Sequence, residues 1–184
     1  MQALFSNLSC QSPYKSVFIR NFADESFNER NMISINNYEE FAQYEGQELG
    51  RSQAIHVTQE RINQFADATI DHQWIHVDEE RCKAESPFGQ TIAHGYLTLS
   101  LLPVMWNQII EVHNLERQMN YGMDKLKFAQ PVLSGQHVFM TATLAEIMNL
   151  RGAIKTTVHI TIWIEESGKK AVDGLATFVY YFKQ

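Results

Sequence analysis

The densest run of polar side chains lies between residues 71 and 78, with the sequence Asp-His-Gln-Trp-Ile-His-Val-Asp. A carboxylate near an imidazole can move protons at neutral pH, so Asp71 and His76 are candidates for an acid/base pair. Five residues along an α-helix are a rotation of about 500°, which would leave the two side chains about 140° apart. They can meet at one substrate only if the run is a loop. The structural alternative is that Asp71 turns or caps the chain and His76 fills a hydrogen-bonded pocket.

His72, His76 and Asp78 are a second candidate constellation, for a metal ion. Two histidines four residues apart and a carboxylate superficially resemble the ligands of zinc or iron. The run lacks the Glu of a His-Glu-x-x-His motif, and Trp74 crowds the space between the histidines. We therefore assign no metal ligands.

Gly95 follows His94 at the start of a long apolar segment. A glycine at a helix N-terminus offers an unpaired backbone N–H and has no Cβ to block a ligand. Such a donor suits an oxyanion that develops on a carbonyl during a reaction. The simpler explanation of an isolated glycine is a tight turn or close packing of a helix on a sheet.

Helix signals flank the polar run on both sides. Thr58 is of the right type to cap a helix that continues to about Ala68. Asp78 can cap a second, short helix, which must end before Pro87. The polar run is therefore placed between two helices.

Residues 92–112 form a long segment that is apolar on nearly all sides. A helix here would be buried rather than amphipathic. Pro103 lies inside the segment and predicts a kink or a break.

The C-terminal third changes from a helical period to the alternation that is typical of strands. The predicted strands are Leu126–Phe128, Val138–Leu144, Ile154–Ile164 and Val172–Phe182. Turns are expected at the glycines between them, and Gly174 inside the last strand predicts a bulge or the close approach of another backbone. Helices followed by antiparallel strands indicate a single α+β domain.

The composition limits the class of protein. The chain has 184 residues, 45% of them hydrophobic, and a formal net charge of −6. The acidic balance argues against a nucleic-acid partner, and no apolar run is long enough to span a membrane. Two cysteines without a Cys-x-x-Cys motif provide neither a disulfide framework nor a zinc site. Because the first residues do not match a secretory signal, we expect a cytoplasmic protein.

Residues 1–31 show no sustained hydrophobic period and differ in this respect from the rest of the chain. We assign residues 1–36 to an N-terminal arm and residues 37–184 to one domain. Met32 is a candidate start of a shorter product.

An ordered series of short motifs resembles a known protein family. The motifs are Phe-Ala-Asp-Ala-Thr at residues 65–69, Asp71, His76, Val77-Asp78, Phe88-Gly89 and Ile92-Ala93-His94-Gly95. Together they resemble the hydratase signature of MaoC-like dehydratases, which include the (R)-specific enoyl-CoA hydratases. The form Asp-His-Gln-Trp-Ile-His is similar to the subgroup related to nodulation protein N. The resemblance covers about residues 37–184.

This resemblance implies a hotdog fold, in which an antiparallel sheet wraps around a long central helix, here residues 94–112. It implies a homodimer that adds water reversibly to a trans-2-enoyl-CoA, giving an (R)-3-hydroxyacyl-CoA. Asp71 and His76 match the catalytic pair that activates water and supplies a proton. Gly95 matches the backbone N–H that polarises the thioester carbonyl. No metal or redox cofactor is implied, because the CoA thioester is the substrate.

The chain departs from the commonest family form at Gln73-Trp74, where Asn-Pro is usual. Gln73 can still hydrogen-bond, and Trp74 is bulky enough to shape the acyl pocket. His94 and Tyr96 complete the expected substrate-binding set together with Ser100, a substitute for a serine that supports the site in some hydratases.

Two other functions remain open on the sequence alone. A thioesterase on the same fold usually needs a carboxylate near a helix N-terminus, where this chain has His94-Gly95. A non-catalytic acyl-CoA-binding module would not need the Asp71/His76 pair. An acidic enzyme that binds the polyanionic CoA needs basic residues near its tunnel, and Lys125 and Lys127 are the nearest candidates in the sequence.

Overall fold

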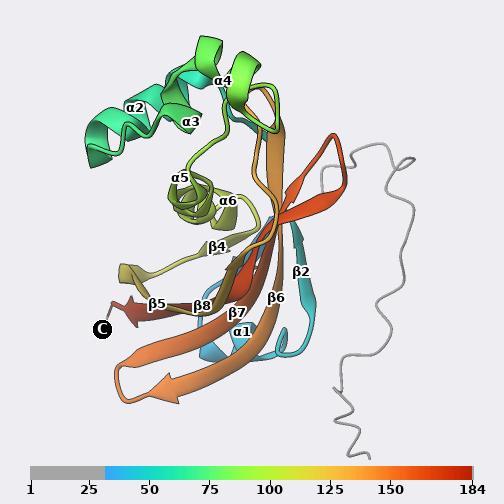
Figure 1. The fold of residues 1–184 in the computed structure, drawn as a ribbon. Helices are drawn as coiled ribbons and strands as arrows, with labels where there is room; N and C mark the ends of the chain where they lie inside the picture. The colour runs from blue at the N-terminus through green and yellow to red at the C-terminus, as the bar shows by residue number, and fades with distance from the viewer. Residues whose placement is uncertain (1–31, 184) are drawn as a thin grey trace, which may run out of the picture. The chain divides into compact units, whose positions relative to one another are not determined.

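Four long strands dominate the part of the chain that the computed structural model describes, residues 32–183. They are β5 (Leu115–Phe128), β6 (His137–Leu150), β7 (Ala153–Ile164) and β8 (Lys169–Phe182). They pair antiparallel in the order β6-β7-β8-β5, and two short strands, β2 (Glu48–Arg51) and β3 (Ile55–His56), pair with β6 (Figure 1). Strands β6, β7 and β8 therefore form an antiparallel meander, and β5, which precedes them in the chain, pairs with β8 at the edge of the sheet.

Strand β7 follows the alternation expected from its sequence. Ile154, Val158, Ile160 and Ile162 are buried in the core, whereas His159 on the other face is exposed. The hairpin turns before and after β7 contain glycines with φ of 88° and 62°, at residues 152 and 168. Only glycine adopts this left-handed region without strain, which confirms both predicted turns.

Strand β5 begins at Leu115, eleven residues before the predicted start at Leu126. It lies at the edge of the described sheet, and most of its residues are exposed. An edge strand with little buried surface does not need alternating apolar residues, so the sequence carried no signal for its first half.

Gly174 in β8 lies close to the backbone of β5. A Cβ at this position would lie 3.3 Å from the Leu126 Cα and 3.2 Å from the Met123 side chain. Opposite it, the pairing register shifts between Asp124 and Lys127. The close approach is thus confirmed, and the irregularity in the ladder lies in β5.

Three helices form the segment before the long apolar stretch. They are α2 (Gln59–Thr69), α3 (Trp74–Val77) and α4 (Glu79–Glu85). The Thr58 hydroxyl accepts a hydrogen bond from the Arg61 N–H, and the Asp78 carboxylate accepts one from the Arg81 N–H. Both predicted caps are confirmed, and they define where α2 and α4 begin.

The central helical segment is shorter than expected. It consists of α5 (Gly95–Ser100) and α6 (Leu102–Trp106), and the chain then forms the strand β4 (Ile110–Val112). The prediction of a helix through Val112 is therefore wrong. Pro103 has no N–H to bond to the preceding turn, so the break that it predicts occurs, at Leu101. The apolar pattern continues past α6 because Ile109 and Ile110, just before and at the start of β4, are also buried in the core.

Residues 33–35 belong to the folded unit. They form β1 (Ile33–Ile35), which pairs parallel with β4, and Ile35 is fully buried. A short helix, α1 (Tyr38–Ala42), comes next and buries Phe41. The fold thus begins before the boundary predicted at residue 37; the rest of the expected arm, residues 1–31, lies outside the described residues.

Both halves of the central segment pack against one face of the sheet (Figure 1). Trp106 is fully buried, stacks on Phe178 and donates a hydrogen bond from Nε1 to the Tyr180 hydroxyl at 3.0 Å. The prediction of a helix buried on all sides is wrong, because Tyr96 is 68% exposed and Val104 48%, and only the side that faces the sheet is buried. A central helical segment packed against an antiparallel sheet is the α+β hotdog arrangement that the motifs imply. Within residues 32–183, no helix is both long and apolar enough to cross a membrane.

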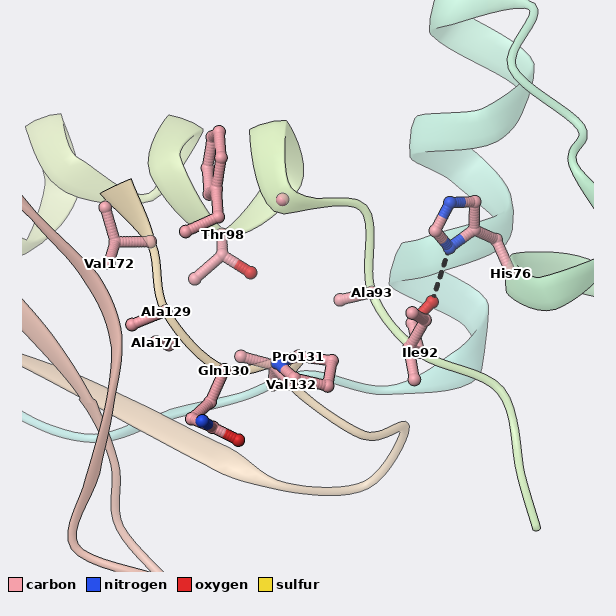
Figure 2. A pocket seen from close by; sticks show the side chains of 12 residues that line it. His76, Ile92, Ala93, Thr98, Ala129, Gln130, Pro131, Val132, Ala171 and Val172 are labelled. Atoms are coloured by element: carbon pink, nitrogen blue, oxygen red, sulfur yellow. Dashed lines mark hydrogen bonds between the residues drawn. The ribbon is translucent and has the colours of Figure 1, made fainter. Parts of the chain in front are cut away.

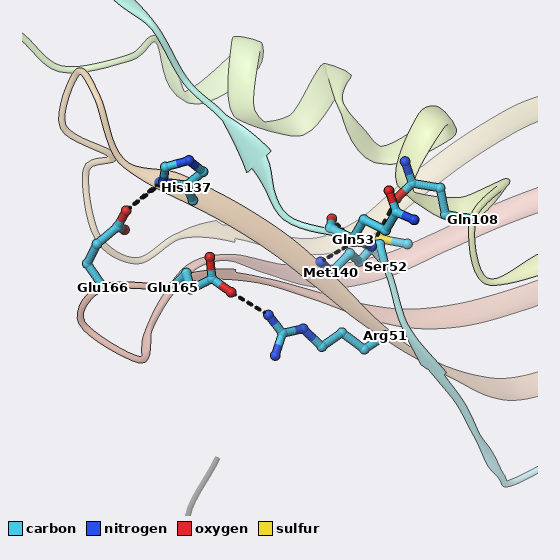
Figure 3. A network of polar contacts seen from close by, with 8 residues as sticks. All are labelled: Arg51, Ser52, Gln53, Gln108, His137, Met140, Glu165 and Glu166. Atoms are coloured by element: carbon cyan, nitrogen blue, oxygen red, sulfur yellow. Dashed lines mark hydrogen bonds and ion pairs between the residues drawn. The ribbon is translucent and has the colours of Figure 1, made fainter. Parts of the chain in front are cut away.

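A network of polar contacts ties β2 to the rest of the sheet (Figure 3). Arg51 forms an ion pair with Glu165 at 2.7 Å, and the Ser52 hydroxyl accepts a hydrogen bond from the Met140 N–H at 2.9 Å. The N–H of Gln53 donates to the Gln108 side chain just after α6. These contacts secure the chain segment that leads into β3 and α2.

Candidate active site

The polar run between α2 and α3 is a short loop followed by one helical turn. Ile70 ends α2 in a left-handed conformation, with φ of 62°, and turns the chain away from the helix axis. The Asp71 side chain lies in the loop and is 56% exposed. His76 lies in α3 and is 9% exposed. The two residues therefore do not share a helix, which satisfies the condition for them to converge.

The His76 ring is held in one tautomer. Its Nδ1 lies 2.7 Å from the carbonyl oxygen of Ile92 (Figure 2). A carbonyl only accepts hydrogen bonds, so Nδ1 carries a proton and Nε2 has a free lone pair when the ring is neutral. The Ile92 N–H in turn donates to the Ile75 carbonyl, at 3.1 Å. These two hydrogen bonds join α3 to the segment that leads into α5.

Burial lowers the pKa of His76 below its ordinary value of 6.5. The hydrogen bond to Ile92 opposes this effect, His94 adds to it, and the nearby Asp71 carboxylate opposes it. The direction of the shift favours a neutral ring near pH 7, which is the form that can accept a proton.

His94 joins Asp71 and His76 in one cluster. Its ring is 3% exposed and stacks on the His76 ring, with 3.7 Å between centroids. Its Nε2 lies 2.9 Å from the Asp71 backbone carbonyl and 3.9 Å from a carboxylate oxygen of the same residue. The sequence run at 71–78 and the start of α5 therefore meet in space.

Gln59 and Thr91 brace the backbone around His76. The Gln59 side-chain amide donates to the His76 carbonyl at 2.7 Å, and its oxygen accepts a hydrogen bond from the Thr91 hydroxyl. Thr91 is buried and directly precedes Ile92, whose carbonyl holds the His76 ring. One side chain of α2 thus connects α3 with the segment that fixes the orientation of His76.

A cavity of about 220 Å³ lies beside His76. Its lining is mostly apolar and comes from the segment around α5, from the end of β5 with the residues after it, and from β8. Figure 2 shows the Thr98 hydroxyl directed toward this space. An apolar cavity of this kind next to a proton-transfer group suits an acyl chain with its reactive carbons at one end.

Gly95 lines the same cavity and packs closely on the sheet side. A Cβ at this position would lie 2.9 Å from the Phe128 ring, so no larger residue fits without movement of that ring. Close packing therefore accounts for the glycine. As the first residue of α5, Gly95 also has an N–H without a partner within the helix.

Gln73 and Trp74 lie at the start of α3. Gln73 is exposed, and its N–H lies 3.4 Å from the Asp71 carboxylate. Trp74 is half-buried, and the Arg81 guanidinium lies 4.3 Å from the centre of its ring. Among the described residues, neither belongs to the lining of the cavity beside His76.

Tyr96 and Ser100 lie on the outer side of α5. Tyr96 is 68% exposed and contacts the Phe128 ring edge-on. The exposed Ser100 donates its hydroxyl hydrogen bond to the Leu97 carbonyl at 2.8 Å. Their expected contacts with substrate therefore stay predictions.

The structure does not assemble the metal site considered from the sequence. The His72 ring pairs with Asp67 at 2.8 Å, and Asp78 caps α4. The cluster that does form contains Asp71, His76 and His94, with one potential ligand atom of each within 4.8 Å of the others.

This cluster fits a metal ion poorly. The two rings stack at an interplanar angle of 27°, so the lone pairs in their planes run side by side rather than toward one point. Zinc ligands at about 2.1 Å around a tetrahedral centre lie about 3.4 Å apart, which is shorter than the 3.9 Å between His94 and the Asp71 carboxylate.

Several residues of the site were not identified from the sequence. Thr98 could have been found, because it is polar within an apolar helix and lies one turn from Gly95. Phe128 and Gln130 could not, because only the order of strands in the sheet brings the end of β5 to α5. Gln59 also carried no signal, since a glutamine in the first turn of a helix is ordinary.

Comparisons with known proteins agree with this geometry. The model of the MaoC like domain family matches residues 40–165. The chain is 46% identical over 127 residues to the 3-hydroxyacyl-thioester dehydratase Z of Mycobacterium tuberculosis (strain H37Rv), covering 68% of this chain and 83% of that protein. It is also 46% identical over 130 residues to nodulation protein N of Rhizobium leguminosarum bv. viciae, covering 69% of this chain and 80% of that protein.

A solved structure supports the fold. The R-hydratase PhaJ1 from Pseudomonas aeruginosa superposes with a TM-score of 0.61 and 19% identity, over 76% of this chain and 83% of that one. At this identity the likeness concerns the fold alone. The family match and the two relatives go further: the chain belongs to the MaoC-like dehydratase family.

Proposed function

We propose that this protein is a hydro-lyase that adds water reversibly to a trans-2-enoyl-CoA and forms an (R)-3-hydroxyacyl-CoA. The observation that carries the proposal is the convergence of the Asp71 side chain with a neutral His76, which itself lines an apolar cavity. The name of the mycobacterial relative, a 3-hydroxyacyl-thioester dehydratase, describes the same reaction class in the reverse direction.

In the direction of hydration, the Asp71/His76 pair takes one proton from water and delivers one proton to the substrate. As the water oxygen bonds to C3 of the enoyl thioester, a proton leaves the water for the Asp71/His76 pair. Nε2 of His76 is the nitrogen free to accept it, because Nδ1 is held by the Ile92 carbonyl. The pair then delivers a proton to C2, so the enzyme ends in its starting protonation state.

The Gly95 N–H is proposed to polarise the thioester carbonyl. Attack at C3 places negative charge on that oxygen, and a fixed backbone donor at the cavity wall stabilises the charge. The chain's own residues supply both the donor and the proton-transfer pair, so we propose that the reaction needs no metal or redox cofactor. Activity should survive treatment with EDTA, and loss of activity that added zinc restores would contradict this.

The proposed substrate and assembly are an acyl-CoA and a homodimer. Lys127 is exposed and precedes Phe128, a residue of the cavity wall, so it and Lys125 are the proposed contacts for CoA phosphates. Replacing both with Gln should raise KM for the enoyl-CoA, and an unchanged KM would contradict their assignment as CoA contacts.

The edge strand β5 is the proposed dimer surface. Met119 and Tyr121 on β5 are exposed apolar side chains and would be covered in a dimer. The cytoplasmic location stays a prediction.

The test is the loss of absorbance of an enoyl thioester on addition of the enzyme. Asp71→Asn and His76→Gln should each lower kcat by about 10² or more, because each removes a member of the proton-transfer pair. The matched control is His72→Gln, which changes a neighbouring histidine that pairs with Asp67 at the surface. Full activity in both catalytic variants would refute the assignment.

The same assay separates the alternative functions. Release of free thiol from acyl-CoA would indicate a thioesterase. Tight binding of acyl-CoA without turnover, on substrates from short to long, would indicate a binding module.

A further inference from the structure

The His94 ring does not cap the helix that it precedes. His94 occupies the N-cap of α5, but its side chain makes no capping hydrogen bond there. It is instead buried between the His76 ring and the Phe65 ring, whose centroid lies 5.1 Å away. The imidazole therefore acts on the 71–78 run rather than on its own helix.

One contact of His94 fixes the backbone of Asp71. The distance from Nε2 to the Asp71 carbonyl oxygen is 2.9 Å, and a carbonyl can only accept, so Nε2 is the protonated nitrogen. Asp71 lies in a loop, and within residues 32–183 the hydrogen bond that its carboxylate accepts comes from the Gln73 N–H, at a long 3.4 Å. The hydrogen bond from His94 thus fixes the backbone position from which the exposed Asp71 side chain extends.

A second contact fixes the plane of the His76 ring. The rings stack at 3.7 Å and 27°, while Nδ1 of His76 is held at its other edge by Ile92. A ring held by one hydrogen bond can still pivot about that bond. The stack removes this freedom and keeps Nε2 of His76 in one direction.

Packing alone does not explain why a polar imidazole, rather than an apolar ring, occupies position 94. Its Nδ1 is buried and has no hydrogen-bond partner among residues 32–183. Burying an unpaired polar atom costs stability, and a phenylalanine would fill the same space without that cost. A polar ring here is explained by the work of its other nitrogen.

We propose that His94 is a positioning residue for the hydration reaction: by donating to the Asp71 carbonyl and stacking on His76, it holds the carboxylate and the imidazole in one productive geometry. The inference rests on the proposed function for its kinetic consequence. The titratable groups that face His76 are Asp71, from the loop before α3, and His94, from the start of α5.

Two variants separate the two contacts. His94→Phe keeps a ring to stack on His76 and removes the donor, whereas His94→Gln keeps a donor near the Nε2 position and removes the ring. Each should lower kcat by about 10- to 100-fold, because small displacements of reacting groups have effects of this size, with KM changed less than about threefold. In His94→Gln the acid limb of the kcat/KM profile should also move to higher pH, as water reaches His76.

The matched control is His137→Phe. His137 also stacks on a histidine, His56, and pairs with the Glu166 carboxylate (Figure 3). It lies in β6 and is not part of the lining of the cavity beside His76. Its kcat should equal that of the wild type. Wild-type kcat in both His94 variants would overturn the proposal. A loss of kcat in His137→Phe as large as the loss in the His94 variants would also overturn it.

A measurement without substrate tests the geometry independently. In nitrogen-15 spectra of the free protein, His94 should show an Nε2–H that exchanges slowly with water, and His76 an Nδ1–H. If the wild type hydrates no enoyl-CoA, the proposed function fails, while a slowly exchanging Nε2–H would still support the role of His94 in ordering Asp71. Rapid exchange of that proton would overturn the inference even if the enzyme is active. Because this measurement uses the wild type, it also decides the case in which the variants do not fold.

Discussion

At the scale of single residues, the protonation state of His76 controls the proposed chemistry. Its Nδ1–H is committed to the Ile92 carbonyl, and burial holds the pKa of the ring below 6.5. The base is therefore ready at a pH where an ordinary histidine would be half protonated. The environment of the ring, rather than the residue type, adapts it to proton transfer near neutrality.

This shift predicts the pH dependence of the enzyme. The reactive form of His76 is neutral, so the acid limb of kcat/KM should lie below pH 6.5, the ordinary value for a histidine. The free energy of unfolding should also fall with pH. As the pH is lowered, His76 is protonated in the unfolded chain before it is protonated in the folded protein, so its contribution to stability is present above pH 6.5 and is lost as the pH falls. A pH–rate profile of the free enzyme measures the first effect. An acid limb clearly above pH 6.5 would contradict it.

At the scale of elements, the caps and turns were readable and the sheet edge was not. Thr58 and Asp78 act on N–H groups three residues away, and the hairpin glycines act on their own φ angles. Because these interactions depend on residue types at nearby positions, they can be predicted from the sequence. The first half of β5 depends on pairing with β8, more than forty residues later, and has no local mark.

The brace between α2 and α3 can be tested by removing one hydroxyl. Thr91→Val keeps the shape of the side chain but removes its hydrogen bond to Gln59, which also holds the His76 carbonyl. We expect a loss of about 1–2 kcal/mol in the free energy of unfolding and a fall in kcat of roughly tenfold. Thr91→Ser retains the hydroxyl and is the control. Chemical denaturation and steady-state kinetics measure both effects; identical values for the two variants would show that the brace is not needed.

At the scale of the whole molecule, the site joins segments that the sequence keeps apart. Asp71, His76, His94 and Gly95, which the structure brings close together, could be proposed from the sequence because they lie within 25 residues and their order resembles the family signature. The cavity wall was not found, because Phe128 and Val172 reach it only through the order of strands in the sheet. Chemistry is local in this chain, whereas the shape of the substrate space is a property of the fold.

The extent of the folded unit yields the last prediction. Ile35 is fully buried, and β1 holds the chain to β4 through hydrogen bonds from Ile33 to Ile109 and from His113 to Ile35. A protein that starts at Met32 keeps these contacts, and its Tm and kcat should match those of the full chain. One that starts at Asn37 loses β1 and the buried Ile35, which should cost about 2–4 kcal/mol and lower Tm by about 5–15 °C. Calorimetry of the three proteins, with molar masses from sedimentation, measures the effect on the fold and on the proposed dimer. Equal melting temperatures for the two truncated proteins would place the boundary at residue 37 after all, whereas a loss of stability in both would assign a structural role to residues 1–31.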